Sequence, residues 1–154
     1  KQKEILSEET AFMMTNLMQT VIDRGTGGSV RWKYNFYHPA AGKTGTTQSW
    51  TDAWFVGFST QIAAGAWFGI DDPQVSLGKG ADGTRAALPA WARFMKTAHD
   101  SLYYSKEEFQ QPEKVQTFSI CQVSKEKPTP LCPLEKELFI QGTEPSRLCK
   151  IHRR

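Results

Sequence analysis

Three consecutive segments with the pattern of β-strands set the strongest limit on how this 154-residue chain can fold. The segments are residues 41–47, 52–59 and 62–70, and only a few residues link each one to the next. Links this short leave no room for a crossover helix, so they favour an antiparallel meander. Glycines inside the predicted strands indicate close backbone approach or bulges, at Gly57, Gly65 and Gly69.

Helical patterns precede and follow these strands. A helix that begins behind the capping Ser7 and stops at Arg24-Gly25 places apolar side chains on one face: Ala11, Met14, Leu17, Met18, Val21 and Ile22. A second helix is predicted over residues 85–102, with Pro89 in the first turn, where a missing N–H costs little. The expected fold class is α+β, an antiparallel sheet flanked by helices. Three strands leave an edge and a face without cover, which favours part of a larger domain.

Composition divides the chain and excludes some functions. After Ser105, charged residues, prolines and cysteines become more frequent and periodicity fades, so we place a boundary near Phe109 and expect an irregular tail over residues 109–154. The net charge of +3 is too small, and too evenly spread, to indicate nucleic-acid binding. No stretch reaches the roughly 18 uninterrupted apolar residues of a membrane span.

Lys43 lies in the run Ala41-Gly-Lys-Thr-Gly-Thr-Thr47, whose lysine has more than one possible chemistry. A phosphate-binding loop needs a glycine five residues before the Gly-Lys-Thr glycine, and Tyr37 occupies that position. The residues after Lys43 have the pattern of strand and turn, so no helix N-terminus would face a phosphate. We therefore exclude the phosphate-binding alternative.

The same run on a strand beside a cleft suits acyl chemistry. Lys43 and Gly45 would point to one side, and Thr44 and Thr46 to the other. Gly45 leaves space for a substrate, and the Thr46 N–H can donate to a carbonyl oxygen that develops negative charge. Hydroxyls for binding a carboxylate come from Thr44, Thr46 and Thr47, and Lys43 contributes positive charge. The plainer alternative is a strand end with a solvent-facing lysine.

The run of residues 41–47 is followed by a second run, Thr51-Asp-Ala-Trp-Phe-Val-Gly-Phe58. Together these runs resemble the transpeptidase domain of class A, bifunctional penicillin-binding proteins. Two further runs resemble the last strand and the C-terminal helix of that family: Ala66-Trp-Phe-Gly-Ile-Asp71 and Ala86-Ala-Leu-Pro-Ala-Trp91 with Phe94-Met95. Four more resemble the cysteine-bearing tail of many members: Ser119-Ile-Cys-Gln, Thr129-Pro-Leu-Cys-Pro133, Phe139-Ile-Gln-Gly-Thr-Glu-Pro145 and Cys149-Lys-Ile-His152. The resemblance implies that residues 1–108 are the C-terminal part of a transpeptidase domain and residues 109–154 its tail.

The resemblance also implies a chemistry. In such an enzyme a serine attacks the D-Ala-D-Ala stem peptide of peptidoglycan, forms an acyl-enzyme and passes the acyl group to an amine. β-Lactams acylate the same serine. By position, Lys43 and Thr46 are the expected catalytic residues, with the Thr46 N–H as half of an oxyanion hole. Thr44, Gly45, Thr46 and Thr47 are the expected substrate-binding residues.

The chemistry of that family also needs two other motifs, Ser-x-x-Lys with the nucleophile and Ser-x-Asn. The sequence contains no Ser-x-Asn. Its two Ser-x-x-Lys matches lie in a Gly-rich loop and in the tail, at Ser76-Leu-Gly-Lys79 and Ser124-Lys-Glu-Lys127. We therefore expect this chain to supply the Lys-Thr-Gly strand without the nucleophile and to be inactive in isolation.

The expected setting follows from that family. The expected partners are the nucleophile-bearing N-terminal part of the same domain, the stem peptide and β-lactam antibiotics, with no nucleic acid, cofactor or metal. The expected location is the extracytoplasmic face of a bacterial cytoplasmic membrane, with an anchor in an absent N-terminal segment. Two alternatives stay open: a non-catalytic module that binds a peptide or protein at an open sheet edge, and an inactive homologue.

The three cysteines, Cys121, Cys132 and Cys149, lie in the last third of the chain. Their place in a Pro-rich segment suits a disulfide in an oxidising compartment, and reduced, packed thiols are the alternative. Zinc ranks third: Cys149 and His152 have a suitable spacer, but the other two cysteines form no Cys-x-x-Cys pair. Of three possible disulfides, we favour Cys132–Cys149.

Overall fold

The computed structural model describes residues 4–72 and 74–152, which form two compact units. One unit is residues 14–109, and the other is residues 110–154 together with residues 1–13. The outermost residues of both predicted domains, 1–3 and 153–154, lie outside the described residues. None of the helices in the described ranges combines the length and the hydropathy of a membrane span.

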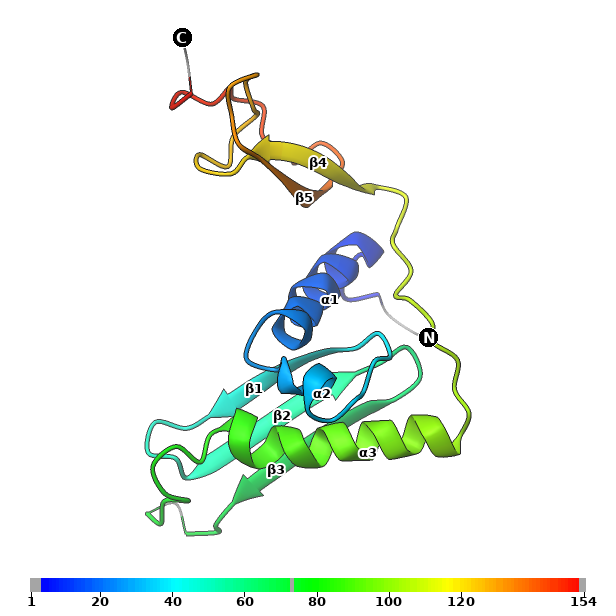
Figure 1. The fold of residues 1–154 in the computed structure, drawn as a ribbon, viewed down its shortest axis with the longest axis vertical. Coiled ribbons are helices and arrows are strands. Elements are labelled where there is room, and N and C mark those ends of the chain that lie inside the picture. Colours follow the sequence, from blue (N-terminus) through cyan, green and yellow to red (C-terminus); the bar gives the residue numbers. More distant parts are fainter. Residues whose placement is uncertain (1–3, 73, 153–154) are drawn as a thin grey trace. The chain divides into compact units, whose positions relative to one another are not determined.

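The three predicted strands form one antiparallel sheet in the order β1-β2-β3 (Figure 1). The strands are β1 (Ala41–Thr46), β2 (Asp52–Phe58) and β3 (Ala63–Gly69). In this register Thr44 lies opposite Phe55, and Gly45 lies opposite Trp54. Along β2 the burial alternates strictly, because one face of the sheet is covered and the other is not. The predicted meander is therefore confirmed.

The helices begin and end close to their predicted positions. The first is α1 (Glu8–Asp23), in which the Ser7 hydroxyl accepts a hydrogen bond from the Thr10 N–H at 3.2 Å. It is followed by α2 (Ser29–Trp32), a four-residue helix that is too short to be revealed by sequence periodicity. The second predicted helix starts earlier than expected, with the π-helical turn η1 (Gly83–Ala87), and continues as α3 (Leu88–Ser101). Asp82 caps this start, because its carboxylate accepts from the N–H groups of Thr84 and Arg85 at 2.9 Å each.

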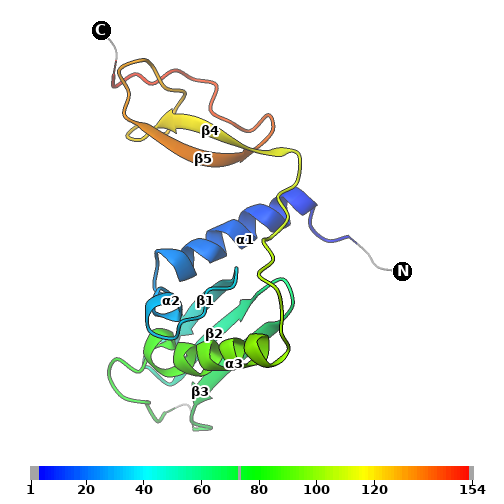
Figure 2. The same cartoon turned by 45° about the vertical axis from the view of Figure 1, so that its right-hand side comes forward.

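Helix α3 covers one face of the sheet, as Figure 1 and Figure 2 both show. Trp91 of α3 packs on Phe55 and donates from Nε1 to the Ala64 carbonyl at 3.0 Å. Gly57 has no room for a side chain, since a Cβ there would lie 2.7 Å from the Trp91 ring. The opposite face is open: Trp54, Val56 and Trp67 are 45%, 53% and 45% exposed.

The C-terminal unit contains a second antiparallel sheet, so the prediction of an irregular tail was wrong. Its strands are β4 (Val115–Cys121) and β5 (Leu134–Ile140). Alternation is weak in both because a two-stranded sheet buries little, and β5 carries three charged residues in succession, Glu135, Lys136 and Glu137. A Pro-containing loop of twelve residues, 122–133, separates the two strands, so no short turn signal marks the hairpin.

Candidate functional site

The Lys-Thr-Gly triplet lies on β1, an outer strand of the sheet in the described part of the chain. The Thr47 N–H donates to the Asp52 carbonyl at 3.2 Å, which fixes the phase of the β1–β2 ladder. Because an antiparallel ladder alternates, Lys43 and Gly45 direct their backbone groups toward β2. The N–H and C=O groups of Thr44 and Thr46 therefore point toward the open edge.

The ammonium group of Lys43 lies at that edge. Its Nζ donates to the Thr44 carbonyl oxygen at 2.9 Å and is 3.5 Å from the Thr44 hydroxyl. The Thr44 hydroxyl is in turn 3.5 Å from the hydroxyl of Thr26, in the loop after α1. A cation and two hydroxyls thus meet on the open side of β1. Such a group can bind a carboxylate or stabilise negative charge that develops on an oxygen.

The Thr46 side chain is held by a residue that the sequence analysis missed. Its hydroxyl accepts a hydrogen bond from the Gly83 N–H at 3.0 Å, so η1 rests on this end of β1. A Cβ on Gly83 would lie 2.4 Å from the Trp54 carbonyl oxygen and 2.8 Å from that of Gly45. Only glycine fits there. Accepting this bond leaves the hydroxyl hydrogen of Thr46 able to donate to a ligand.

The Thr47 hydroxyl is used by the turn between β1 and β2. It accepts from the N–H groups of Thr51 and Asp52 at 3.0 and 2.9 Å. The Thr51 hydroxyl donates to the Asp52 carboxylate, so the Thr47 hydroxyl donates to Thr51, 2.8 Å away. Both lone pairs and the hydrogen of Thr47 are then engaged. The same carboxylate accepts from Trp67 Nε1 at 2.9 Å, which ties this turn to β3.

Gly45 contributes to packing as well as to access along the strand. Its Cβ position faces the open side of the sheet, where a methyl group would lie 3.3 Å from the Trp54 Cβ. An alanine there would require Trp54 to move by a few tenths of an ångström. Glycine therefore keeps β1 close to β2 and leaves the strand accessible from this face.

A buried serine–histidine contact, Ser59 with His99, does not have the arrangement of a catalytic pair. His99 Nδ1 lies 2.8 Å from the Met95 carbonyl, which can only accept, so Nε2 accepts from the Ser59 hydroxyl at 3.0 Å. The Ser59 oxygen also accepts from the N–H groups of Gln61 and Ile62, at 3.1 Å each. With Ser59 and His99 6% and 1% exposed, the contact closes the β2–β3 turn inside the core. It supplies no nucleophile that a substrate could reach.

His38 lies beside this contact. It stacks on Phe36 and tilts against His99, with ring centroids 5.5 and 4.5 Å apart. Its Nδ1 is buried without a hydrogen-bond partner among the described residues. Burial, together with the positive charge of Lys106, lowers the pKa of His38 below its usual value. The imidazole is therefore kept neutral as part of the fold.

Two cavities belong to the unit formed by residues 1–13 and 110–154. One, of about 610 Å³, is lined by residues of the C-terminal unit between Phe118 and Ser146, and the other, of about 660 Å³, lies around Ser7 and Lys114. Neither includes a residue of the segment 43–47. The cleft that the sequence predicts beside the Lys-Thr-Gly strand stays a prediction.

Comparison with known proteins matches two consecutive segments of the chain to protein families. Residues 1–95 match the family model of the penicillin binding protein transpeptidase domain, and residues 111–154 match that of the penicillin-binding protein 1A C-terminal domain. Penicillin-binding protein 1A of Aquifex aeolicus is 34% identical over 96% of this chain, and that of Clostridium tetani is 32% identical over 97%. The chain spans only 19% of the length of each of these relatives.

A solved structure has the same fold as most of this chain. The crystal structure of penicillin-binding protein 1A from Haemophilus influenzae superposes with a TM-score of 0.83 at 31% sequence identity, over 94% of this chain and 22% of that one. The family model of the transpeptidase domain covers more than half of the residues, and the α+β fold agrees with this structure. The chain therefore belongs to the penicillin-binding protein transpeptidase family.

Proposed function

We propose that this chain supplies the Lys-Thr-Gly strand of a serine D,D-transpeptidase that cross-links peptidoglycan stem peptides. The observation that carries the proposal is the open edge of β1, to which the Thr46 N–H points and at which the Lys43 ammonium lies. Family membership supports the reaction class.

The proposed chemistry uses the edge in two ways. A stem peptide lies along β1 and places its scissile carbonyl oxygen near the Thr46 N–H. When a serine attacks that carbonyl, the oxygen takes up negative charge, and the N–H stabilises it as one half of an oxyanion hole. Removing one such donor costs about 10²–10³ in rate. The terminal carboxylate is bound by the Thr44 and Thr46 hydroxyls, within the positive field of Lys43.

Gly45 and Thr47 support this arrangement indirectly. Gly45 keeps the strand accessible to the peptide backbone. Because the turn engages the Thr47 hydroxyl, we propose that Thr47 acts on the substrate by fixing the position of Thr46.

The nucleophile, in this proposal, comes from residues outside these 154. Neither Ser-x-x-Lys match starts a helix. The Ser76 hydroxyl donates to the Ser49 carbonyl at 2.8 Å in a loop, and the Ser124 hydroxyl accepts from the Glu126 N–H at 3.3 Å in a turn. The exposed apolar face of β2 and β3, with Trp54, Val56 and Trp67, supports a further segment of the transpeptidase domain packing there. By itself the chain would then be inactive.

The setting is proposed on the same basis. Peptidoglycan is assembled outside the cytoplasm, so we place the protein on the extracytoplasmic face of the bacterial cytoplasmic membrane, anchored by residues outside those given. Its partners are then the nucleophile-bearing part of the domain, the stem peptide and β-lactams.

Covalent labelling with a fluorescent penicillin tests the proposal. The longer protein that contains this chain should be labelled, and the 154 residues alone should not. In the longer protein, Lys43→Ala should slow acylation by about 10²-fold or more, whereas Lys79→Ala should leave it unchanged. Lys79 is the matched control because it belongs to a Ser-x-x-Lys match and is also exposed. Labelling of the isolated chain, or normal acylation of the Lys43→Ala protein, would refute the proposal.

A non-catalytic binding module is the second candidate, and the open edge and exposed sheet face are what favour it. Such a module would bind an unreactive peptide as an added strand. The isolated chain should then bind that peptide with unchanged affinity after Lys43→Ala, and the longer protein should not react with penicillin.

A further inference from the structure

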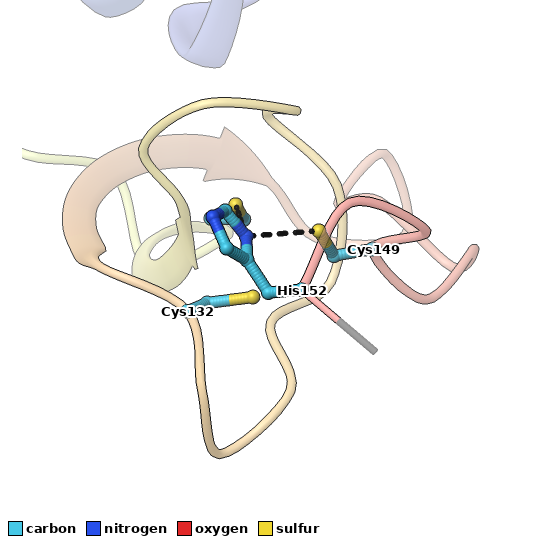
Figure 3. A group of neighbouring side chains, drawn as sticks. Cys132, Cys149 and His152 are labelled. Atoms are coloured by element: carbon cyan, nitrogen blue, oxygen red, sulfur yellow. Dashed lines mark hydrogen bonds between the residues drawn. The ribbon is translucent and has the colours of Figure 1, made fainter. Parts of the chain in front are cut away.

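Four potential metal ligands converge in the C-terminal unit, far along the chain from the Lys-Thr-Gly strand. They are Cys121, Cys132, Cys149 and His152, and their ligand atoms all lie within 4.8 Å of one another. Figure 3 shows the side chains of Cys132, Cys149 and His152 directed toward a common centre. Cys121 and Cys149 are fully buried, and the other two are half-buried.

The fold brings these residues together from three segments. Cys121 ends β4, and Cys132 lies two residues before β5, so the two flank the loop of the hairpin. The last segment returns to that loop through two backbone hydrogen bonds. The Lys127 N–H donates to the Arg147 carbonyl at 2.9 Å, and the Cys149 N–H donates to the Lys127 carbonyl at 2.8 Å. Cys149 and His152 are thereby held against the hairpin loop.

The distances fit tetrahedral coordination. With Zn–S bonds of about 2.3 Å and Zn–N bonds of about 2.0–2.1 Å, a tetrahedron has S···N edges of about 3.5 Å and S···S edges of about 3.8 Å. His152 Nδ1 lies 3.4 Å from the sulfurs of both Cys121 and Cys149. One N–H cannot donate fully to two sulfurs, whereas one metal ion contacts all three atoms. The remaining sulfur, that of Cys132, lies within 4.8 Å of these three atoms.

We propose that Cys121, Cys132, Cys149 and His152 form a structural zinc site that stabilises the C-terminal unit. On binding, the three thiols release their protons to solvent and coordinate as thiolates. The neutral imidazole offers the lone pair of Nδ1 and keeps its hydrogen on Nε2. Four protein ligands close the coordination shell, so the site is structural and leaves no position for catalysis.

Backbone N–H groups donate hydrogen bonds to the sulfurs of Cys121 and Cys132, as groups around the ligands of a zinc site do. The Ser124 N–H donates to the Cys121 sulfur at 3.5 Å, and the Thr129 N–H donates to the Cys132 sulfur at 3.2 Å. The Thr129 hydroxyl lies 3.3 Å from the same sulfur and donates to the His152 carbonyl at 2.7 Å. Hydrogen bonds of this kind orient ligands and strengthen metal binding.

This unit is small, so a bound metal ion would contribute substantially to its stability. Its sheet has two strands, and among residues 4–13 and 110–152 the buried apolar residues outside the cluster are Val115 and Ile120. A two-stranded hairpin of this size is marginally stable in water without a staple. A metal that ties the hairpin loop to the chain end would supply that stability, since its binding energy appears as folding energy.

Zinc fits better than the alternatives weighed from the sequence. The favoured Cys132–Cys149 disulfide is not formed in the structure, and the sulfurs gather around His152 instead. Any one disulfide would leave one cysteine and the imidazole without a role. A tetrahedral set of three thiolates and one imidazole selects zinc among common divalent ions, because magnesium and calcium prefer oxygen ligands. The sequence ranked zinc last because the ligand spacing has no close Cys-x-x-Cys pair.

Metal content and thiol reactivity of the 154-residue chain test the proposal. When the chain is purified under reducing conditions without chelator, inductively coupled plasma mass spectrometry should find about one zinc ion per chain. Cys149→Ser and His152→Gln should reduce this content several-fold. Lys150→Ala is the matched control, because Lys150 lies between two ligands in sequence, is exposed and offers no ligand at this site. Thr129→Val should weaken zinc affinity by about 10–100-fold.

A measurement on the unmodified chain keeps the test independent of variants that fail to fold. With zinc bound, all three cysteines should react slowly with a thiol reagent. A chelator should make them reactive, and added zinc should protect them again. Cobalt(II) should give the intense visible absorption of a tetrahedral thiolate site. Thiol reactivity that neither chelator nor zinc alters, or a purified chain containing a disulfide and no metal, would overturn the proposal. These results do not depend on penicillin binding, so the site can fail without the proposed function failing.

Discussion

Replacing Gly83 by alanine probes the contact that holds Thr46 in place. The backbone angle φ of Gly83 lies outside the left-handed region, so alanine pays no conformational penalty there. The cost comes from contact alone: the new Cβ would lie 2.4 Å from the Trp54 carbonyl oxygen and 2.8 Å from that of Gly45. Both are backbone atoms inside paired strands and cannot turn aside, so η1 has to move away from β1.

The magnitude follows from two losses. Overpacking at a well-packed site costs about 1–3 kcal/mol, and the hydrogen bond from the Gly83 N–H to the Thr46 hydroxyl contributes about 1 kcal/mol. We therefore expect the free energy of unfolding to fall by about 2–4 kcal/mol. Once the Gly83 N–H no longer holds the Thr46 hydroxyl, a misplacement of that hydroxyl by about 1 Å should also lower the rate of penicillin acylation in the longer protein by about 10²-fold.

Urea denaturation followed by tryptophan fluorescence measures the stability, because Trp91 is buried against the sheet. Gly65→Ala is the matched control. It also adds one methyl group to a glycine of this unit, but at an ordinary 3.6 Å contact with a Val56 side-chain carbon. Its free energy of unfolding should stay within about 0.5 kcal/mol of the original. If the two variants unfold at the same urea concentration, the close approach of Gly83 to β1 is wrong.

Three further changes test the surroundings of the site. Thr47→Val removes the acceptor for the Thr51 and Asp52 N–H groups and should lower the free energy of unfolding in urea by about 1 kcal/mol. The control is Thr60→Val, because Thr60 is exposed. Equal stability of the two variants would contradict the assigned turn. Because the pKa of His38 is lowered in the folded state, the unfolded state binds its proton more readily, so the free energy of unfolding should fall as pH drops below about 6.5. His38→Asn should make this fall smaller. A pH profile of stability that the substitution leaves unchanged would refute the assigned role of His38. Trp91→Ala should cost about 3–5 kcal/mol in the same assay, and a loss below 1 kcal/mol would show that α3 does not pack on the sheet as described.

How far the sequence predicted the fold depends on how local each signal is. The three-stranded sheet and the long helices were predictable, because apolar periodicity and short turns act within a few residues. The second sheet was not, because β4 and β5 bury few residues and are joined by a long loop. The cysteine–histidine cluster combines three segments that are separated in sequence, so the Cys149–His152 spacing indicated only two of its four members.

The site shows the same division. From the run of residues 41–47 we predicted that the Thr46 N–H and the Lys43 charge act at one site, and their catalytic roles stay a prediction. Two details depend on tertiary contacts: the hold of Gly83 on the Thr46 hydroxyl, and the turn that engages Thr47. The sequence shows a Gly-rich loop ending in Asp82 and Gly83, but nothing in it indicates that Gly83 contacts Thr46.

The most direct test of the account is a crystal structure of the longer protein acylated by a penicillin. We predict that the acyl carbonyl oxygen lies about 2.7–3.1 Å from the Thr46 backbone nitrogen, with the drug carboxylate beside the Thr44 and Thr46 hydroxyls. An acyl carbonyl directed away from β1, or a Thr46 N–H paired with another strand, would contradict it.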